Sequence, residues 1–309
     1  MPFLKISGQE RAELPGGVWG GDEYRPAPAV EGRRRLCGSA ECAGGWAMPW
    51  RSRRRPVFEG QWGCSGRCVL AMARVAVRRE LGDGVVAAPH RHRVPLGLVM
   101  LAQGWITQAQ LRRALEAQRE NGTGRIGEWL IAECGVDAEQ VARGLSVQWN
   151  CPVLTTEGFS PETMARVMPR LFVEEFGLLP LRVAGSKILY LGVEDRLDAS
   201  VTLAVEQMTE LQVVSGLVTA PQLMIARSRL MECETVAVRQ EQLSDADTLA
   251  ARITAILEQK QPVESRLARV HGYYWLRLWM ERGTVGRLGS LPTTGEDMRD
   301  YIFTLGARS

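Results

Sequence analysis

The chain has 309 residues, of which 45% are hydrophobic and 24% charged, and its net charge is +3. At roughly 100–200 residues per domain, this length allows two or three domains with buried cores. No apolar run reaches the roughly 18 residues of a membrane-spanning helix, which excludes that class. The first residues lack the charged start and apolar stretch of a secretory signal, so we expect a cytoplasmic protein.

The N-terminal third differs from the rest in charge. Residues 1–93 contain 16 Lys or Arg and 9 Asp or Glu, a net charge of +7, and the remaining residues therefore carry −4. Within this part, residues 1–32 are rich in Gly, Pro and charged side chains, which favours a flexible lead-in.

Four cysteines follow within a short stretch, spaced C-x4-C and C-x3-C around a hairpin-sized gap. Two close pairs can bring four thiolates to one tetrahedral ion, and in a reducing compartment a metal is favoured over disulfides. The second pair leads directly into a helix-forming segment, whose start stabilises thiolates. We predict a zinc-type module with a helix at residues 33–88, holding a structural zinc ion. The predicted ligands are Cys37, Cys42, Cys64 and Cys68.

Two arginine runs, residues 33–35 and 51–55, lie beside these cysteines. A basic zinc module can contact nucleic acid, whereas a run of charge is usually a solvated surface. We favour the solvated surface and do not expect nucleic acid as a partner. A nucleic-acid-binding regulator remains an alternative.

The middle of the chain contains a tandem repeat. Residues 95–118 and 125–148 align without gaps, and each predicts a short apolar helix, a turn and an amphipathic helix. A capping box is predicted before each second helix, from Thr107 with Gln110 and from Asp137 with Gln140. We therefore expect a pseudo-symmetric helical bundle at residues 93–158. Equivalent positions are Leu96/Ile126, Gly97/Gly127, Met100/Leu130, Leu111/Val141 and Gln118/Gln148.

This repeated motif resembles the N-terminal domain of type II secretion and type IV pilus assembly ATPases. The resemblance continues through the segment after the second repeat and a hairpin at residues 178–193, and covers about residues 95–230. In that family the domain docks to an inner-membrane assembly platform, and in some members the tandem motif binds cyclic di-GMP.

The resemblance implies a set of ligand-binding positions here. A glycine in each first helix would allow close approach of a base or phosphate, flanking aliphatic side chains would offer an apolar surface, and arginine would pair with phosphate or guanine. Pro95 stands where the family has arginine, and Cys134 where it has glycine, so both a binding bundle and a bundle that only packs remain open. The predicted ligand residues are Leu96, Gly97, Gln118, Arg125, Ile126, Gly127 and Gln148.

The remaining chain alternates helix and strand patterns. Residues 159–232 predict a small α/β subdomain with a two-strand hairpin and a third strand. Its helical segments are expected at about residues 160–176, where Pro169 restarts the pattern, and at about residues 198–208 and 220–230. Residues 233–309 predict a C-terminal α/β appendage, in which a helix reaching Lys260 precedes two alternating strands, with a loosely structured tail after Gly283. Aromatic side chains fall on both faces of that strand pair, which indicates that both faces are covered.

No catalytic motif accompanies these elements: the sequence lacks a G-x-x-x-x-G-K-[ST] loop, a G-x-S-x-G elbow and an H-E-x-x-H pair. We therefore predict an α+β protein without enzymatic activity, an adaptor or sensor that contacts a protein partner in a secretion or pilus pathway. The inner-membrane assembly component is the expected partner, and a cyclic di-GMP receptor is the first alternative.

Overall fold

The computed structural model describes most of the chain between Cys37 and Gly306. The predicted lead-in at residues 1–32 and both arginine runs lie outside the described residues. The structure describes residues 37–42, 56–82, 94–185, 187–195, 197–280 and 298–306.

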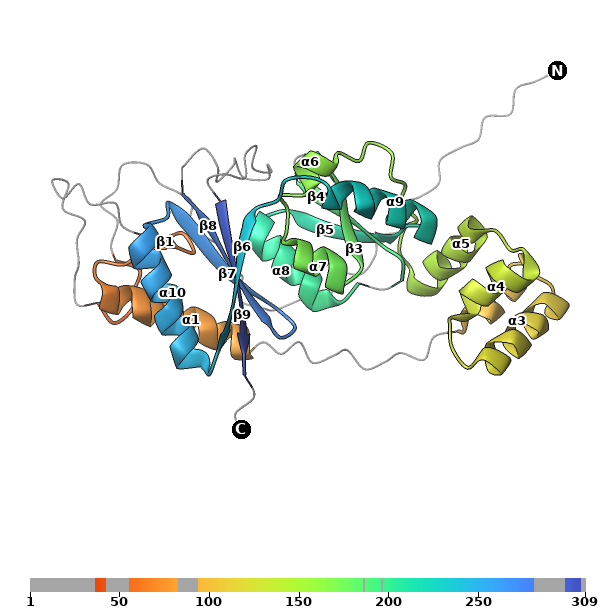
Figure 1. Cartoon of the computed structure of the whole chain (residues 1–309), viewed down its shortest axis with the longest axis horizontal. Coiled ribbons are helices and arrows are strands. Elements are labelled where there is room, and N and C mark those ends of the chain that lie inside the picture. Colours follow the sequence, from red (N-terminus) through yellow and green to blue (C-terminus); the bar gives the residue numbers. More distant parts are fainter. Residues whose placement is uncertain are drawn as a thin grey trace, which may run out of the picture. The chain divides into compact units, whose positions relative to one another are not determined.

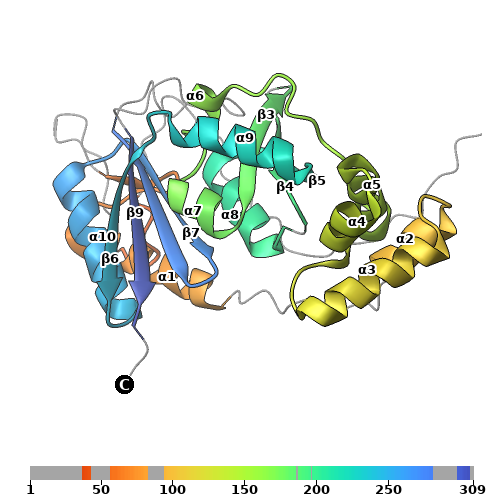
Figure 2. The same cartoon turned by 45° about the vertical axis from the view of Figure 1, so that its right-hand side comes forward.

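The tandem repeat folds as two similar helical hairpins, which we call the repeat bundle (residues 95–149; Figure 2). Its helices are α2 (Leu96–Ala102), α3 (Gln108–Asn121), α4 (Ile126–Cys134) and α5 (Ala138–Trp149). The first helix of each repeat packs against the second helix of the other, so α2 lies on α5 and α4 on α3. The hairpins are therefore interlocked through one shared core.

Local sequence explains where these helices begin and end. Thr107 and Gln110 form the predicted capping box at α3. Before α5, Asp137 caps the helix by accepting from the Glu139 N–H at 2.9 Å, and the reciprocal bond predicted from Gln140 is not part of the cap. Gly122 and Gly135 end α3 and α4 in the left-handed conformation, which favours glycine.

The second region is the α/β subdomain (residues 159–232). A three-stranded sheet has the order β3-β4-β5, with β3 and β4 antiparallel and β4 and β5 parallel. Two short helices precede the hairpin, because Pro169 interrupts the helical pattern and restarts it, as the sequence predicts. The elements are α6 (Pro161–Met164), α7 (Arg170–Glu175), β3 (Leu178–Ala184), β4 (Ile188–Val193), α8 (Ala199–Thr209), β5 (Gln212–Leu217) and α9 (Ala220–Met231).

The third region joins the two ends of the described chain. A four-stranded sheet of order β6-β9-β8-β7 is covered on one face by α1 and α10, which lie side by side (Figure 1). We call this region the cysteine–sheet unit. It comprises β1 (Val57–Phe58), β2 (Gln61–Trp62), α1 (Gly66–Gly82), β6 (Ala237–Leu243), α10 (Ala246–Lys260), β7 (Glu264–Val270), β8 (Tyr273–Trp279) and β9 (Met298–Leu305).

One core cluster of the cysteine–sheet unit joins its helices to one face of the sheet. Val69, Ala73 and Val77 of α1 pack in one cluster with side chains of α10 and of the sheet. The sequence-based boundaries, which placed residues 33–88 and 233–309 in separate domains, do not match this shared core. The two segments are separated by residues 89–232, so no local pattern indicates that they meet.

The other face of the same sheet is also buried, as the alternating aromatic residues predict. Trp275 and Ile302 belong to the core of the α/β subdomain, and Trp275 lies edge-on against Phe172 at 5.4 Å between ring centroids. The prediction of a loosely structured tail is wrong for residues 298–305, because β9 occupies an interior position of the sheet between β6 and β8.

A buried ion pair connects this sheet to the α/β subdomain. Arg277 of β8 donates to both carboxylate oxygens of Asp300 of β9 at 2.8 and 2.7 Å, and Trp275 Nε1 donates to the same carboxylate. A further Arg277 nitrogen donates to the Val167 carbonyl at 2.9 Å. All charged and polar groups of this cluster are thus paired, which a buried charge requires.

The mixed α and β organisation confirms the predicted fold class. Among the described helices, none combines the length and apolar character needed to cross a membrane.

Candidate functional sites

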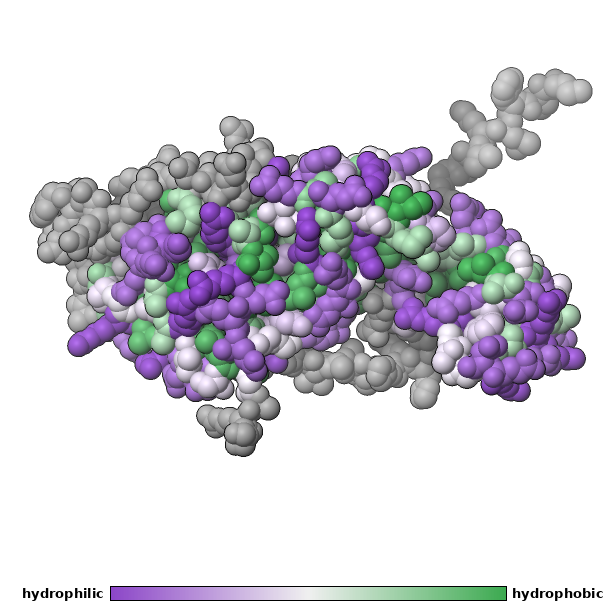
Figure 3. Space-filling model, viewed as in Figure 1, coloured by the Kyte–Doolittle hydropathy of each residue, from purple (hydrophilic) through white to green (hydrophobic). Residues whose placement is uncertain are grey.

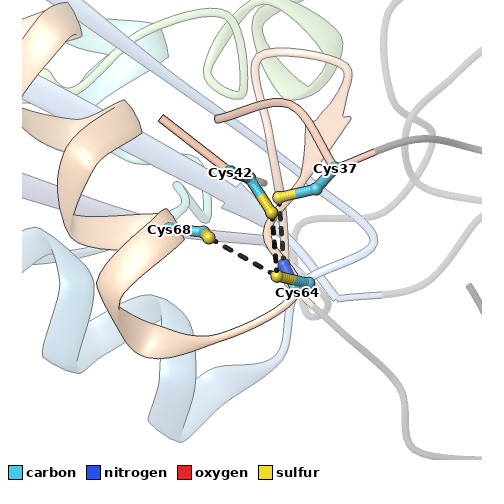
Figure 4. A group of neighbouring side chains, drawn as sticks. All are labelled: Cys37, Cys42, Cys64 and Cys68. Atoms are coloured by element: carbon cyan, nitrogen blue, oxygen red, sulfur yellow. Dashed lines mark hydrogen bonds between the residues drawn. The ribbon is translucent and has the colours of Figure 1, made fainter. Parts of the chain in front are cut away.

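The predicted cysteine ligands converge on one point (Figure 4). Cys37 and Cys42 lie on the segment before the β1–β2 hairpin, Cys64 follows β2, and Cys68 lies in the first turn of α1. Their four Sγ atoms all lie within 4.8 Å of one another, with 3.5 Å between Cys42 and Cys64 and 3.4 Å between Cys64 and Cys68.

This spacing fits tetrahedral coordination by sulfur. With metal–sulfur bonds of about 2.3 Å, the ligand sulfurs of a zinc tetrahedron lie about 3.8 Å apart. The Cys64 N–H also donates to Cys37 Sγ at 3.3 Å, a bond that stabilises a thiolate. The donor set therefore suits a soft metal ion, and four protein ligands leave no open coordination position.

The pKa values of Cys64 and Cys68 depend on hydrogen bonds with the neighbouring thiols. The pKa of Cys64 is raised to about 12, first because its thiol hydrogen-bonds with Cys68 and then because of burial. The pKa of Cys68 is lowered, chiefly by its hydrogen bond with Ser65. A metal ion would have to displace protons from this cluster, so its affinity should increase with pH.

Two glycines allow the loops to meet at the cluster. The Gly38 N–H donates to the Trp62 carbonyl at 2.9 Å, and a side chain at this position would collide with Gln61 at 2.3 Å. At Gly63, a Cβ atom would lie 2.6 Å from Val69 of α1. Close backbone approach thus brings the first cysteine pair to the second.

The repeat bundle contains the predicted dinucleotide-binding residues, arranged with internal pseudo-symmetry. Gln118 donates to the Gly124 carbonyl and Gln148 donates to the Val94 carbonyl, each at 2.8 Å. Each bond thus joins the last residue of one repeat to the residue that precedes the other repeat. The two donors, and likewise the two acceptors, are 30 positions apart in the sequence, which is the repeat length including the connection. Both glutamines hold the bundle together.

In the first helix of each repeat, a side chain of the same repeat occupies the space beside the glycine Cα atom. A Cβ atom on Gly97 would lie 2.4 Å from Leu111, and one on Gly127 would lie 2.9 Å from Val141. Leu96 is only 7% exposed and Ile126 is partly buried, so both belong to the bundle core. The structure therefore places these predicted ligand residues in packing positions, where they offer little flat surface.

Arg125 is the one charged residue among the predicted ligand residues. Its side chain is 65% exposed and pairs with Asp195, in the turn after β4, at 2.9 Å. Its backbone N–H donates to Glu128 at 3.1 Å. This ion pair connects the repeat bundle to the α/β subdomain, a link that the sequence did not indicate. At the equivalent position the first repeat has Pro95, which carries no charge.

Comparisons with known proteins agree with the resemblance seen in the motif. The chain is 28% identical to the type IV pilus assembly ATPase PilB of Myxococcus xanthus over 95 residues, which are 30% of this chain and 17% of that protein. The structure of MshE with cdg shares 23% identity at a TM-score of 0.37, and the match covers 45% of this chain and 99% of the chain in that structure. The N-terminal domain of XpsE shares 18% identity at a TM-score of 0.33, covering 45% and 98%. No family model matches the chain.

The similarity to pilus assembly ATPases predicted from the tandem motif is confirmed by the match to PilB. The match covers only about a sixth of the length of PilB. The activity, substrates and partners of the whole ATPase thus have to be tested separately for this chain.

Proposed function

We propose that this chain is a non-enzymatic adaptor of a secretion or pilus-type pathway, in which the repeat bundle and the α/β subdomain together bind a protein partner. The observation that carries the proposal is the interlocked bundle itself, joined to the α/β subdomain through Arg125 and Asp195. A partner could contact both folded regions at once, and this binding would need no catalytic residue.

Exposed aliphatic side chains support a protein-binding surface. Met224 and Ile225 of α9 are 66% and 60% exposed, and Val147 of α5 is 54% exposed. Figure 3 shows hydrophobic side chains gathered over α9 and α5 on one face of the molecule. Exposed apolar groups of this kind mark interaction sites more often than single scattered residues do. The expected partner is an inner-membrane component of a secretion or pilus assembly system.

A two-hybrid assay tests this proposal against the secretion and pilus inner-membrane proteins encoded in the same genome. The double variant Met224→Glu and Ile225→Glu should abolish a pairwise signal. The matched control is Leu203→Glu, since Leu203 of α8 is also an exposed aliphatic residue. No signal with any of these proteins, or equal loss in the control, would contradict the adaptor function or this placement of its surface.

A cyclic di-GMP receptor is the second candidate, and one specific observation favours it. Arg125 presents an accessible guanidinium at the start of the second repeat, where phosphate or guanine recognition needs a planar cation. Isothermal titration with cyclic di-GMP tests this function. Arg125→Ala should weaken binding about ten- to a hundredfold, the effect of one charge-assisted pair.

The matched control for that titration is Arg112→Ala, which removes an exposed arginine of the same bundle. Absence of binding by the unaltered chain would exclude the receptor and leave the adaptor. Binding that survives Arg125→Ala would show that the ligand site lies elsewhere.

For the cysteine cluster, we propose one structural zinc ion bound by Cys37, Cys42, Cys64 and Cys68. Four thiolates would bring the fixed geometry that this short hairpin lacks by itself. Elemental analysis should give about one zinc per chain in purified protein. Cys64→Ser should remove it, and Cys134→Ser, which changes a cysteine outside the cluster, should not. Substoichiometric metal in the unaltered chain would refute the site.

A further inference from the structure

Helix α1 carries a basic face that neither the cysteine cluster nor the repeat bundle uses. Arg67, Arg74 and Arg78 are all exposed, at intervals of seven and four residues. At 100° per residue, these intervals place them along one stripe of the helix. The one acidic residue of α1, Glu80, is buried on another side. The outward face is therefore basic without an acidic residue of its own.

The opposite face of α1 holds the helix rigidly in place. Val69, Ala73 and Val77 pack in the core of the cysteine–sheet unit. The fourth arginine, Arg79, points inward and donates to both Glu59 carboxylate oxygens at 2.7 Å. Because these contacts fix the helix, the three outward arginines keep their spacing along its axis.

That spacing and the net charge of the flanking sequence suit a polyanion. Arg74 and Arg78 lie about 6 Å apart along the axis, and Arg67 lies about 10 Å before Arg74, at about 1.5 Å per residue. Residues 33–93 contain 13 arginines and 4 acidic residues, a net charge of +9, so the rest of the chain is acidic on balance. Guanidinium groups pair with phosphate through two parallel hydrogen bonds.

We propose that the outward face of α1 binds the phosphate backbone of nucleic acid. An anionic lipid surface is the less suitable occupant, because a helix that binds membranes inserts a broad apolar face. The apolar face of α1 with Val69, Ala73 and Val77 is buried in the core, and Val75 and Leu81 are the exposed large apolar side chains of this helix. Binding through phosphates requires no base contacts and is independent of sequence.

One carboxylate competes with such a ligand. Asp247 at the start of α10 pairs with Arg74 at 3.2 Å, and both side chains are largely accessible. A phosphate that contacts Arg74 would replace this pair or share the guanidinium with it. Removal of the Asp247 charge should therefore strengthen binding.

Fluorescence anisotropy with a labelled duplex DNA of mixed sequence, measured on the full chain across a salt series, tests the proposal. We expect binding at about 50 mM salt that weakens steeply as salt increases. The triple variant Arg67→Gln, Arg74→Gln and Arg78→Gln should weaken it about tenfold or more and reduce the salt slope by about two to three. Asp247→Asn should tighten binding severalfold.

Matched variants separate this site from general charge effects. Arg112→Gln, Arg119→Gln and Arg229→Gln together remove the same charge from exposed positions outside the cysteine–sheet unit, and Glu116→Gln matches Asp247→Asn. Circular dichroism verifies that each variant is folded. No DNA binding by the unaltered chain, or equal weakening in both triple variants, would overturn the proposal. It would also fail if the α1 variant lost binding only to vesicles containing phosphatidylglycerol.

Discussion

The repeat bundle and the cysteine–sheet unit differ in how their cores are built. The bundle core comes from one continuous stretch, residues 96–145, and its helices begin and end at local signals. The core of the cysteine–sheet unit takes side chains from both ends of the described chain, from Phe58 to Phe303. Contacts over such distances carry a larger loop-closure cost and leave no local pattern. The comparison indicates that the two regions should respond separately to substitution.

Loss of the cysteine cluster should have the largest effect, and only on one side of this comparison. In Cys64→Ser, or after chelation, the free energy of hydrogen-exchange protection of amides in α1 and α10 should fall by more than about 3 kcal/mol. The reason is that the cluster holds the start of α1, and α1 and α10 share one core. Protection in α3 should be unchanged. Cys134→Ser, within the bundle, is the control. Unaltered protection of α10 would show that the cluster does not stabilise the sheet.

The buried pair between Arg277 and Asp300 should come next. Asp300→Ala leaves an unpaired guanidinium that is only 2% exposed, which should cost about 3–5 kcal/mol of unfolding free energy. Urea denaturation measures this loss. Asp247→Ala, which removes a largely exposed partner, should cost less than about 1 kcal/mol. Similar losses in both variants would mean that the buried cluster has no special role.

Substitution of the bundle glycines tests the other region. Gly97→Ala and Gly127→Ala should each destabilise by about 1–3 kcal/mol, because the added Cβ atom meets Leu111 or Val141. Hydrogen exchange should show the loss in α2–α5 and leave the protection of β8 intact. Gly82→Ala, where the added atom meets nothing within 4 Å, provides the control. A loss of protection in β8 would contradict separate cores.

The smallest effect concerns Glu264, where the β1–β2 hairpin meets β7. Burial raises the pKa of its carboxyl group, although the Gly60 and Ser265 N–H groups donate to it and partly oppose this. A raised folded-state pKa means that the group's contribution to stability is present below its unfolded pKa and is lost as pH rises through the folded value. Relative to Glu264→Gln, the unaltered chain should therefore lose stability from about pH 4 to 7.

Denaturation midpoints of both proteins across that pH range give the measurement. Relative to Glu241→Gln, the unaltered chain should instead gain stability as pH rises, because its hydrogen bond with Arg252 lowers the pKa of Glu241 and the ionised form stabilises the fold. A pH-independent difference between the unaltered chain and Glu264→Gln would show that this carboxyl group does not titrate differently in the folded state.

Several elements could be predicted because their signals are local. The tandem helices, the cap at Thr107, the hairpin at residues 178–193 and the two-faced strand β8 follow from periodicity and capping residues. The convergence of the four cysteines followed from their spacing. The position of β9 did not, because nothing near residues 298–305 indicates that they pair with β6 and β8.

The candidate sites show the same division. The sequence identified Arg125, but its ion pair with Asp195 depends on how the bundle meets the turn after β4. It also indicated an apolar ligand surface at Leu96, whereas the structure buries that side chain. A motif defines which residues recur, and it does not define which of their faces the neighbouring helix covers.

The sequence by itself determined the repeat, the cysteine spacing and the face alternation, because each depends on residues within a few turns or one strand of each other. Only the tertiary structure decided that the cysteine segment and the last strand share one core, and that α1 directs Arg67, Arg74 and Arg78 outward. These arrangements depend on which distant apolar surfaces bury one another, and that choice is made by the free energy of the whole fold.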